Sequence, residues 1–471
     1  MLFNSLSFVL FLVIVLGLYY SKALSWTSKK RMLLFSSYVF YGLWNPPLVI
    51  LLWISTFVDW TTGKKLAIEE NQIKRNFWLS ISMIVNLGFL FFFKYGNFLL
   101  ENFTALVNSI GLNYHPQKMD IILPMGISFY TFQTMSYTID MYYKKMKPAK
   151  TFLDFSLYVT FFPQLVAGPI VRAEDLIEQF YEPKKATINQ FIWGIFLLTL
   201  GLFQKVVMAD TLLSSASDAI YNSGKIVSFW DAWMGTLAFS GQIFFDFAGY
   251  STCAIGISLM LGILLPDNFK YPYASIGFSD LWSRWHISLS TWLRDYLYIP
   301  LGGNRHGMVR MYVALMLTML LGGLWHGAAW TFIFWGGLHG SYLIFERLQK
   351  KYMPFKVTKW NGIFLAFLTF TCVNITWVFF RAKEFVTAKN MLSSMFLMNP
   401  VGEKVLGLFD LIKVGIVISL LFLCHWAMRN TSVKEVSKKI SPLSLALVWV
   451  VMILLISIAQ GSGEQFIYFQ F

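Results

Sequence analysis

The sequence predicts an all-α integral membrane protein with about eleven transmembrane helices plus re-entrant and interfacial helices. Hydrophobic residues make up 56% of the 471 residues and charged residues only 13%, whereas a soluble domain carries about 25% charged residues. So few charges could not cover a water-exposed surface. The apolar runs are nearly continuous and lack the every-second-residue alternation of barrel strands, so we expect helical spans.

Apolar runs predict the spans in chain order. The first, residues 2–20, is long enough to cross a bilayer, which takes about 20 helical residues. It lacks a basic leading region and a small-residue cleavage site, so we expect a retained span rather than a signal peptide. Further spans are expected near residues 32–58, 77–93, 120–140, 152–171, 187–208, 227–247, 250–265, 311–325, 327–346, 362–380, 411–428 and 441–460.

The net charge of +14 is spread over loops and forms no stripe that would suit a nucleic acid. Basic clusters are typical of cytoplasmic loops, and the first of them predicts an extracytoplasmic N-terminus. We interpret each cluster as a topology signal and lipid head-group contact rather than a binding site. The clusters are Lys22/Lys29/Lys30/Arg31, Lys144/Lys145/Lys147/Lys150, Arg347/Lys350/Lys351 and Arg429/Lys434/Lys438/Lys439.

A single membrane domain is expected over residues 1–471, because the loops are short and no repeat or soluble module is visible. Its expected parts are N-terminal spans (1–115), a core with the histidine motifs (120–400) and C-terminal spans (405–471). The cysteines lie in apolar segments without a pairing pattern, which favours neither a disulfide framework nor a metal site. They are Cys253, Cys372 and Cys424.

Proline and glycine interrupt three of the apolar runs. The interruptions are Asn45-Pro46-Pro47, Leu123-Pro124-Met125-Gly126, and Phe162-Pro163-Gln164 with Gly168-Pro169. Non-helical backbone at membrane depth is tolerated only where it is buried in protein or lines a cavity. Taken together the breaks favour an interior cavity or funnel, and ordinary kinking for packing is the alternative.

The segment Asp280 to Pro300 predicts a helix in the membrane interface. Trp282, Trp285, Leu289, Trp292 and Tyr296 are spaced 3, 4, 3 and 4 residues apart and share one helical face. Tryptophans at head-group depth are typical of such helices. His286 lies at the edge of this face, where it either points inward toward a site or snorkels to the surface.

His326 lies inside the apolar run Leu321 to Gly337, LGGLWHGAAWTFIFWGG. An ionisable side chain at membrane depth is costly and is usually kept for function or for an internal partner. A neutral imidazole in an apolar tunnel is a competent general base. The residues alone leave two interpretations of His326 open, a general base and a hydrogen-bonded structural histidine that ties two spans together.

Among the other histidines, His286 is the best partner for His326. His115 and His306 lie in polar loops, His425 near the end of a span, and His339 on another face of any helix shared with His326. Two histidines make a poor metal site, which wants three or four ligands. No G-x-S-x-G, Walker A or G-x-G-x-x-G motif is present, so direct transfer with histidine as base is the available chemistry.

Two histidine motifs resemble the signature of membrane-bound O-acyltransferases. They are Ser283 to Ser290 (SRWHISLS), continuing through Trp292 to Tyr296, and Leu324 to Gly327 (LWHG). The resemblance is strongest to the bacterial AlgI/PatA-like branch, the membrane subunits for O-acetylation of alginate, peptidoglycan or other polysaccharides. Further matching runs are Leu123–Phe129, Phe162–Ile170, Asp246–Ser251, Tyr298–Arg305 and Phe466–Phe469.

The resemblance implies a ring of transmembrane helices around a thin centre, with His326 as general base. It implies that His286 positions or polarises the acyl group or the acceptor. Other residues are expected in the tunnel wall or beside the histidines, or else in purely structural roles. In the structural alternative, Asp295 pairs with Arg294 or Arg284, and Asp246 caps a helix beside Gly249. These residues are Trp325, Arg284, Trp285, Asp246, Arg294, Asp295 and Asn304.

The resemblance also implies transfer of an acetyl group from a cytoplasmic thioester, acetyl-CoA, toward an extracytoplasmic polysaccharide. It implies no bound cofactor, a multi-pass protein of the bacterial cytoplasmic membrane, and a separate SGNH-type partner that completes transfer. D-alanyl transfer to teichoic acid, as in the DltB branch, is the nearest alternative; the Tyr298–Arg305 run and the length of 471 argue against it. A transporter for an acyl group or glycan and a structural scaffold for a glycan synthase are the alternatives from other classes.

Overall fold

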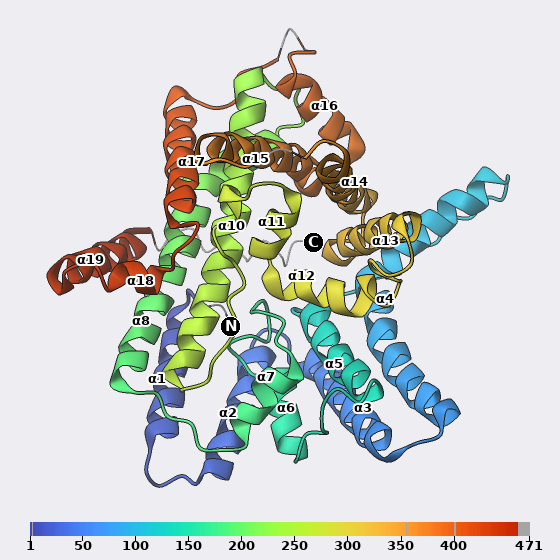
Figure 1. Ribbon diagram of the computed structural model, residues 1–471, viewed down its shortest axis with the longest axis vertical. Coiled ribbons are helices and arrows are strands. Elements are labelled where there is room, and N and C mark those ends of the chain that lie inside the picture. Colours follow the sequence, from blue (N-terminus) through green and yellow to red (C-terminus); the bar gives the residue numbers. More distant parts are fainter. Residues whose placement is uncertain (2, 355, 400–401, 460–471) are drawn as a thin grey trace. The chain divides into compact units, whose positions relative to one another are not determined.

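The computed structural model of the protein describes residues 1, 3–354, 356–399 and 402–459 (Figure 1). Within these ranges the regular secondary structure is helical and no strand forms; one isolated bridge joins Val227 and Glu403. The predicted all-α fold class is therefore confirmed. The motif Phe466–Phe469 lies outside the described residues.

Seven helices in the described ranges are long and apolar enough to cross a membrane, which makes this a multi-pass membrane protein. They span Gln72–Ser109, Ile188–Tyr221, Phe229–Met260, Met308–His326, Asn361–Arg381, Leu408–Met428 and Pro442–Ala459. The sequence predicted about eleven crossings, so fewer helices than expected are long and apolar enough to span the membrane. Two predicted spans, 227–247 and 250–265, form the single helix α10 (Phe229–Met260), and others form helices of 15 to 17 residues, such as α1 (Leu6–Tyr20) and α2 (Trp26–Gly42).

Contacts divide the chain into two compact units, and the single-domain organisation stays a prediction. The first unit holds residues 1–198 and 253–266, and the second holds 199–252 and 267–471. Helices α8 and α10 contribute residues to both units. The first unit contains α1, α2, η1 (Pro46–Leu48), α3 (Val49–Ile68), α4 (Gln72–Ser109), α5 (Ile127–Tyr142), α6 (Phe152–Thr160), α7 (Ala173–Ile177), η2 (Glu178–Phe180) and most of α8 (Ile188–Leu202).

Buried polar groups tie the helices of the first unit together. The Asp59 carboxylate on α3 accepts hydrogen bonds from the Asn86 amide on α4 (2.8 Å), from the Thr138 hydroxyl on α5 (3.1 Å) and from the Ser82 hydroxyl. Lys30 on α2 forms a buried ion pair with Asp154 on α6 at 2.5 Å. Lys30 was predicted to belong to a basic loop cluster, but it is buried and holds α2 and α6 together. A buried ammonium needs a paired carboxylate.

The predicted chain breaks at Pro124–Gly126 and Phe162–Gly168 lie against each other in the first unit. Gly126 has φ +72°, and a Cβ there would lie 2.7 Å from the carbonyl oxygen of Leu165. Glycine is thus required by both its backbone angle and the close approach. The non-helical segment at Phe162 to Gly168 is buried in protein, as non-helical backbone at membrane depth must be unless it lines a cavity. The interior funnel stays a prediction.

The second unit carries both histidine motifs. It contains the π-helix η3 (Phe203–Ser214), α9 (Ser215–Tyr221), the first part of α10, η4 (Pro272–Ala274), α11 (Phe278–Arg284), α12 (Ile287–Leu293), the π-helix η5 (Arg294–Tyr298), α13 (Met308–His326), α14 (Trp330–Tyr352), α15 (Lys359–Arg381), α16 (Phe385–Met395), α17 (Leu408–Met428), α18 (Val433–Ser437) and α19 (Pro442–Ala459). A core cluster in this unit gathers buried side chains from α10, α11, α14, α15, α16 and α17.

Candidate active site

Two glycines bring α13 into backbone contact with α14. A Cβ at Gly323 would lie 2.2 Å from the carbonyl oxygen of Phe332, and one at Gly336 would lie 2.2 Å from that of Met319. Only glycine permits this approach, as in other closely packed membrane helices. The contact fixes the last turn of α13, which ends at His326.

Aromatic rings enclose His326, which is 4% exposed. The ring centroids of Trp325, Trp335 and Phe380 lie 5.0, 5.1 and 5.3 Å from that of the imidazole. These rings come from α13, α14 and α15. His326 therefore stands at a helix end, inside an aromatic shell supplied by three helices.

The expected continuous interfacial helix over Asp280–Pro300 is wrong. The chain forms α11, breaks at Trp285-His286 and resumes as α12 and η5; His286 has φ +43° and ψ 55°. The aromatic face also packs inside the protein, with Trp285, Leu289 and Trp292 only 4%, 1% and 3% exposed. The 3- and 4-residue spacing selected apolar side chains, but it does not reveal the break at His286 or distinguish contact with lipid from contact with protein.

The break places His286 in the core, where it is 0% exposed. Its ring meets Phe247 edge-on at 4.6 Å between centroids, and its Nδ1 lies 3.3 Å from Oδ1 of Asn268. His286 lies outside the candidate spans, and burial lowers the pKa of its imidazole to about 3. The side chain is therefore neutral at physiological pH.

The structure brings His286 and His326 together, with ring centroids 6.5 Å apart. The rings are too far apart for a direct hydrogen bond between nitrogens, and close enough to contact one small group of atoms. Trp325, also predicted for the site, has its ring 6.0 Å from that of His286. The Trp285 ring packs against Phe269. Its ring centroid is 5.2 Å from that of Phe269, and the Phe269 ring stacks on His286 at 6.5 Å between centroids.

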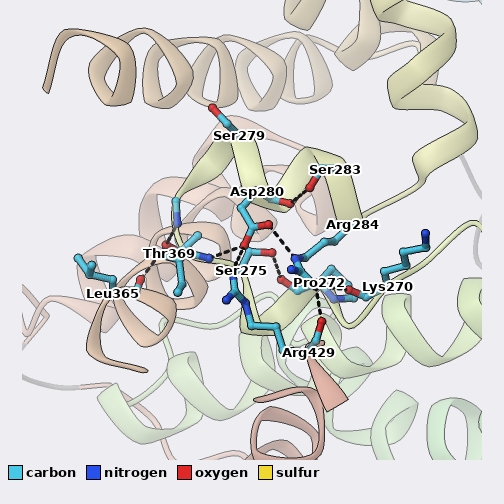
Figure 2. Close-up of polar contacts among 12 residues, drawn as sticks. Lys270, Pro272, Ser275, Ser279, Asp280, Ser283, Arg284, Leu365, Thr369 and Arg429 are labelled. Atoms are coloured by element: carbon cyan, nitrogen blue, oxygen red, sulfur yellow. Dashed lines mark hydrogen bonds and ion pairs between the residues drawn. The ribbon is translucent and has the colours of Figure 1, made fainter. Parts of the chain in front are cut away.

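Arg284 belongs to an ionic cluster around Asp280, which we call the Asp280 cluster (Figure 2). Its Nε donates to Asp280 at 2.8 Å, and Arg429, just beyond α17, donates to the other carboxylate oxygen at 2.6 Å. Burial opposes ionisation of Asp280, but hydrogen bonds from the Ile276 N–H and from both guanidinium groups outweigh it and lower the pKa of the carboxyl. Arg284 thus holds α11 in place from outside the aromatic shell.

Asp246 pairs with a lysine. It lies inside α10 and so caps no helix end; Lys205 Nζ lies 2.6 Å from its Oδ1 and 2.7 Å from that of Asp210. All three side chains are 12% exposed or less. Lys205 and Asp210 lie on η3, so this buried triad joins the π-helix to α10.

The remaining predicted residues lie on η5 and in the segment that follows it. Arg294 pairs with adjacent Asp295 at 2.7 Å, as in the structural alternative. Asn304 accepts hydrogen bonds from the Tyr298 hydroxyl at 2.6 Å and from Arg347 at 3.3 Å. Arg294 and Asp295 thus lie at the start of η5, and Asn304 contacts its last residue, Tyr298.

Sequence reasoning missed three polar residues of this core. Asn268 contacts His286 directly, and nothing in its loop sequence, DNFK, sets it apart. His425, expected near the membrane interface, is 4% exposed and accepts the Tyr273 N–H at 3.2 Å. His339 is on a separate helix, α14, where its Nε2 lies 3.0 Å from the Thr376 hydroxyl. In the described ranges no three His, Cys, Asp or Glu side chains gather as metal ligands.

Comparison with known proteins identifies the family. The family model for the membrane-bound O-acyltransferases matches residues 149–385. The chain is 41% identical to the "Probable alginate O-acetylase AlgI" of Pseudomonas putida over 84% of this chain and 80% of that protein. It is 38% identical to a peptidoglycan O-acetyltransferase of Helicobacter pylori over 79% of this chain and 74% of that protein.

A more distant relative is the teichoic acid D-alanyltransferase of Bacillus subtilis, 29% identical over 58% of this chain and 72% of that protein. The region that the family model matches, residues 149–385, contains both histidines and the aromatic shell around them. The chain therefore belongs to the membrane-bound O-acyltransferase family, and the protein is an O-acyltransferase.

Proposed function

We propose that this O-acyltransferase moves an acetyl group from a cytoplasmic thioester donor, acetyl-CoA, to an extracytoplasmic polysaccharide. The observation that carries the proposal is the pair of buried imidazoles, His286 and His326, with centroids 6.5 Å apart. The names of two relatives, an alginate O-acetylase and a peptidoglycan O-acetyltransferase, support acetyl transfer to a polysaccharide.

The proposed chemistry starts from a histidine buried inside an aromatic shell. His326 accepts the proton of the acceptor hydroxyl as its oxygen attacks the thioester carbonyl. A C–O ester bond forms, the C–S bond breaks, and the proton passes from the imidazolium to the leaving thiolate. His286 positions or polarises one of the reactants. Because His286 and His326 are only 0% and 4% exposed, the shell limits hydrolysis of the thioester by water.

D-alanyl transfer to teichoic acid is the second candidate, supported by the 29% identical Bacillus subtilis relative. We favour acetyl transfer because the acetylating relatives are 38% to 41% identical and match 79% to 84% of the chain. An SGNH-type partner acting in trans, a bacterial cytoplasmic membrane location and an extracytoplasmic N-terminus complete the proposal.

Purified protein in liposomes, given acetyl-CoA labelled in the acetyl group and alginate oligosaccharides, tests this function. We expect free CoA on the donor side and labelled ester on the oligosaccharide; if the SGNH-type partner is needed for the last step, CoA release still requires His326. Accumulation of intact labelled acetyl-CoA in the lumen, without CoA release, would show a transporter instead. D-alanyl transfer from a charged carrier, with acetyl-CoA inert, would support the teichoic acid alternative.

A further inference from the structure

Asn268 is buried against the histidine-bearing turn of the second unit. It is 1% exposed and lies in the segment between α10 and η4. Its Oδ1 lies 3.3 Å from His286 Nδ1 and accepts hydrogen bonds from the Ser288 N–H at 3.2 Å and the Ser288 hydroxyl at 2.9 Å. Its amide nitrogen donates to the Ser251 hydroxyl at 3.2 Å. One side chain therefore joins α10, α12 and the turn that carries His286.

These contacts fix which end of the Asn268 amide faces the imidazole. A backbone N–H only donates, so the amide atom that meets the Ser288 N–H must be the carbonyl oxygen. The same oxygen faces His286 Nδ1. Two acceptors at 3.3 Å would repel each other, so Nδ1 must carry the ring proton.

The backbone holds the turn so that this contact persists. His286 adopts φ +43°, a left-handed conformation that non-glycine residues hold only where the surroundings impose it. The Ile287 N–H donates to the backbone oxygen of Asn268 at 2.9 Å, and the Lys270 N–H donates to that of Arg284 at 2.9 Å. Backbone hydrogen bonds therefore clamp the Asn268 segment to the turn on both sides of His286.

A neutral imidazole with its proton on Nδ1 has a lone pair on Nε2. Such a nitrogen accepts a hydrogen bond from a hydroxyl and does not donate one to a thioester carbonyl. We infer that Asn268 is a positioning residue that fixes the Nδ1–H tautomer of His286, so that His286 Nε2 accepts a hydrogen bond from a second hydroxyl of the acceptor, beside the one whose proton His326 takes, rather than contacting the acyl donor. This inference rests on the proposed function and assigns the acceptor side of the site to His286.

The tautomer can be measured without any activity assay. Solid-state NMR of protein with ¹⁵N-labelled histidine in lipid bilayers separates protonated from unprotonated ring nitrogens, and a His286→Gln variant assigns the signals. We expect protonated Nδ1 and unprotonated Nε2 for His286 in the wild type. Protonated Nε2 in the wild type would overturn the inference, whatever the behaviour of any variant.

Kinetics with matched variants test the consequence. Asn268→Leu removes the acceptor oxygen at similar volume, so we expect the KM for the acceptor to rise about 10-fold, which corresponds to the loss of about one hydrogen bond. The KM for the donor should not change. Asn268→Asp keeps an oxygen toward Nδ1 and should recover most of the loss.

The control is Asn374→Leu, another buried asparagine of this unit, whose amide donates to the Phe370 carbonyl oxygen at 2.8 Å. It should leave both KM values unchanged. Equal effects of Asn268→Leu on donor and acceptor would contradict the inference. If the wild type transfers no acetyl group at all, the proposed function fails, while the NMR result still decides the tautomer.

Discussion

Gly323 and Gly336 decide where His326 stands. A Cβ on either glycine would lie only 2.2 Å from a backbone carbonyl oxygen of the facing helix. The glycines beside the histidine motif therefore serve close packing of α13 on α14, and His326 takes its position from that contact. If α13 and α14 packed less closely, His326 would not keep its place in the aromatic shell.

Gly336→Ala should separate α13 from α14 and displace His326. We expect at least a 10-fold loss of acetyl transfer, because a misplacement of about 1 Å in a catalytic group can cost about 100-fold. Gly337→Ala is the matched control, since its Cβ would meet only Leu320 Cδ2 at 3.4 Å. Transfer rates and folded yields of the two variants in detergent check this prediction; equal activity would contradict it.

At the scale of elements, the Lys205 triad joins η3 to α10. A π-helical stretch often marks a functional segment, and here it carries Lys205 and Asp210 on one helix facing Asp246 on the other. The triad explains Asp246 without a transport pathway, because a carboxylate paired within 3 Å of a buried ammonium is a structural link.

Lys205→Met should destabilise the protein strongly. The substitution removes the ammonium that pairs with both Asp210 and Asp246, and breaking a buried ion pair from one side costs about 3–5 kcal/mol. Lys205→Arg keeps the charge and is the control. Thermal unfolding in detergent should show a large drop in Tm for Lys205→Met alone; unchanged Tm would mean that the triad does not stabilise this unit.

The Asp280 cluster links α11 to the end of α17 and to α15, where the Thr369 hydroxyl accepts the Gly277 N–H at 2.9 Å (Figure 2). The folded-state pKa of Asp280 is lowered, so the unfolded chain holds its proton more tightly. The ionised Asp280 carboxylate therefore stabilises the folded protein fully above the pKa that Asp280 has in the unfolded chain, about 3.9. This stabilisation is lost as the pH falls through the pKa of Asp280 in the folded protein.

The Tm difference between wild type and Asp280→Asn should accordingly stay constant from pH 7 to about pH 5 and narrow below about pH 4. Asp267→Asn, at an exposed carboxylate of the neighbouring segment, should follow the wild type throughout. A Tm difference that grows on acidification would contradict this account of the ion pairs.

Sequence patterns predicted these elements unevenly. The histidine motifs pointed to His286 and His326 as a pair, and the structure brings them together. The break before α12 was missed because the 3- and 4-residue spacing of Trp282, Trp285 and Leu289 continues through it. The partnership of Lys205 with Asp246 joins residues 41 positions apart, and local periodicity carries no information about such a contact.

At the scale of the whole molecule, the chain is a multi-pass membrane enzyme, and its basic clusters predict its orientation in the membrane. The basic residues after α1 predict that this loop is cytoplasmic and the N-terminus extracytoplasmic. Ala23 is an exposed residue of the loop. In a cysteine-free background, Ala23→Cys should react with a membrane-impermeant maleimide only after permeabilisation; labelling of intact cells would reverse the orientation.

The central claim is that buried histidines catalyse acyl transfer, and His326→Ala tests it most directly. Wild-type and variant protein, inserted in liposomes at equal levels, would be compared for CoA release from acetyl-CoA in the presence of acceptor. We expect the rate to fall by about 10²- to 10⁴-fold, the contribution of a general base, with unfolding unchanged. Wild-type rates from a correctly inserted His326→Ala variant would contradict the account.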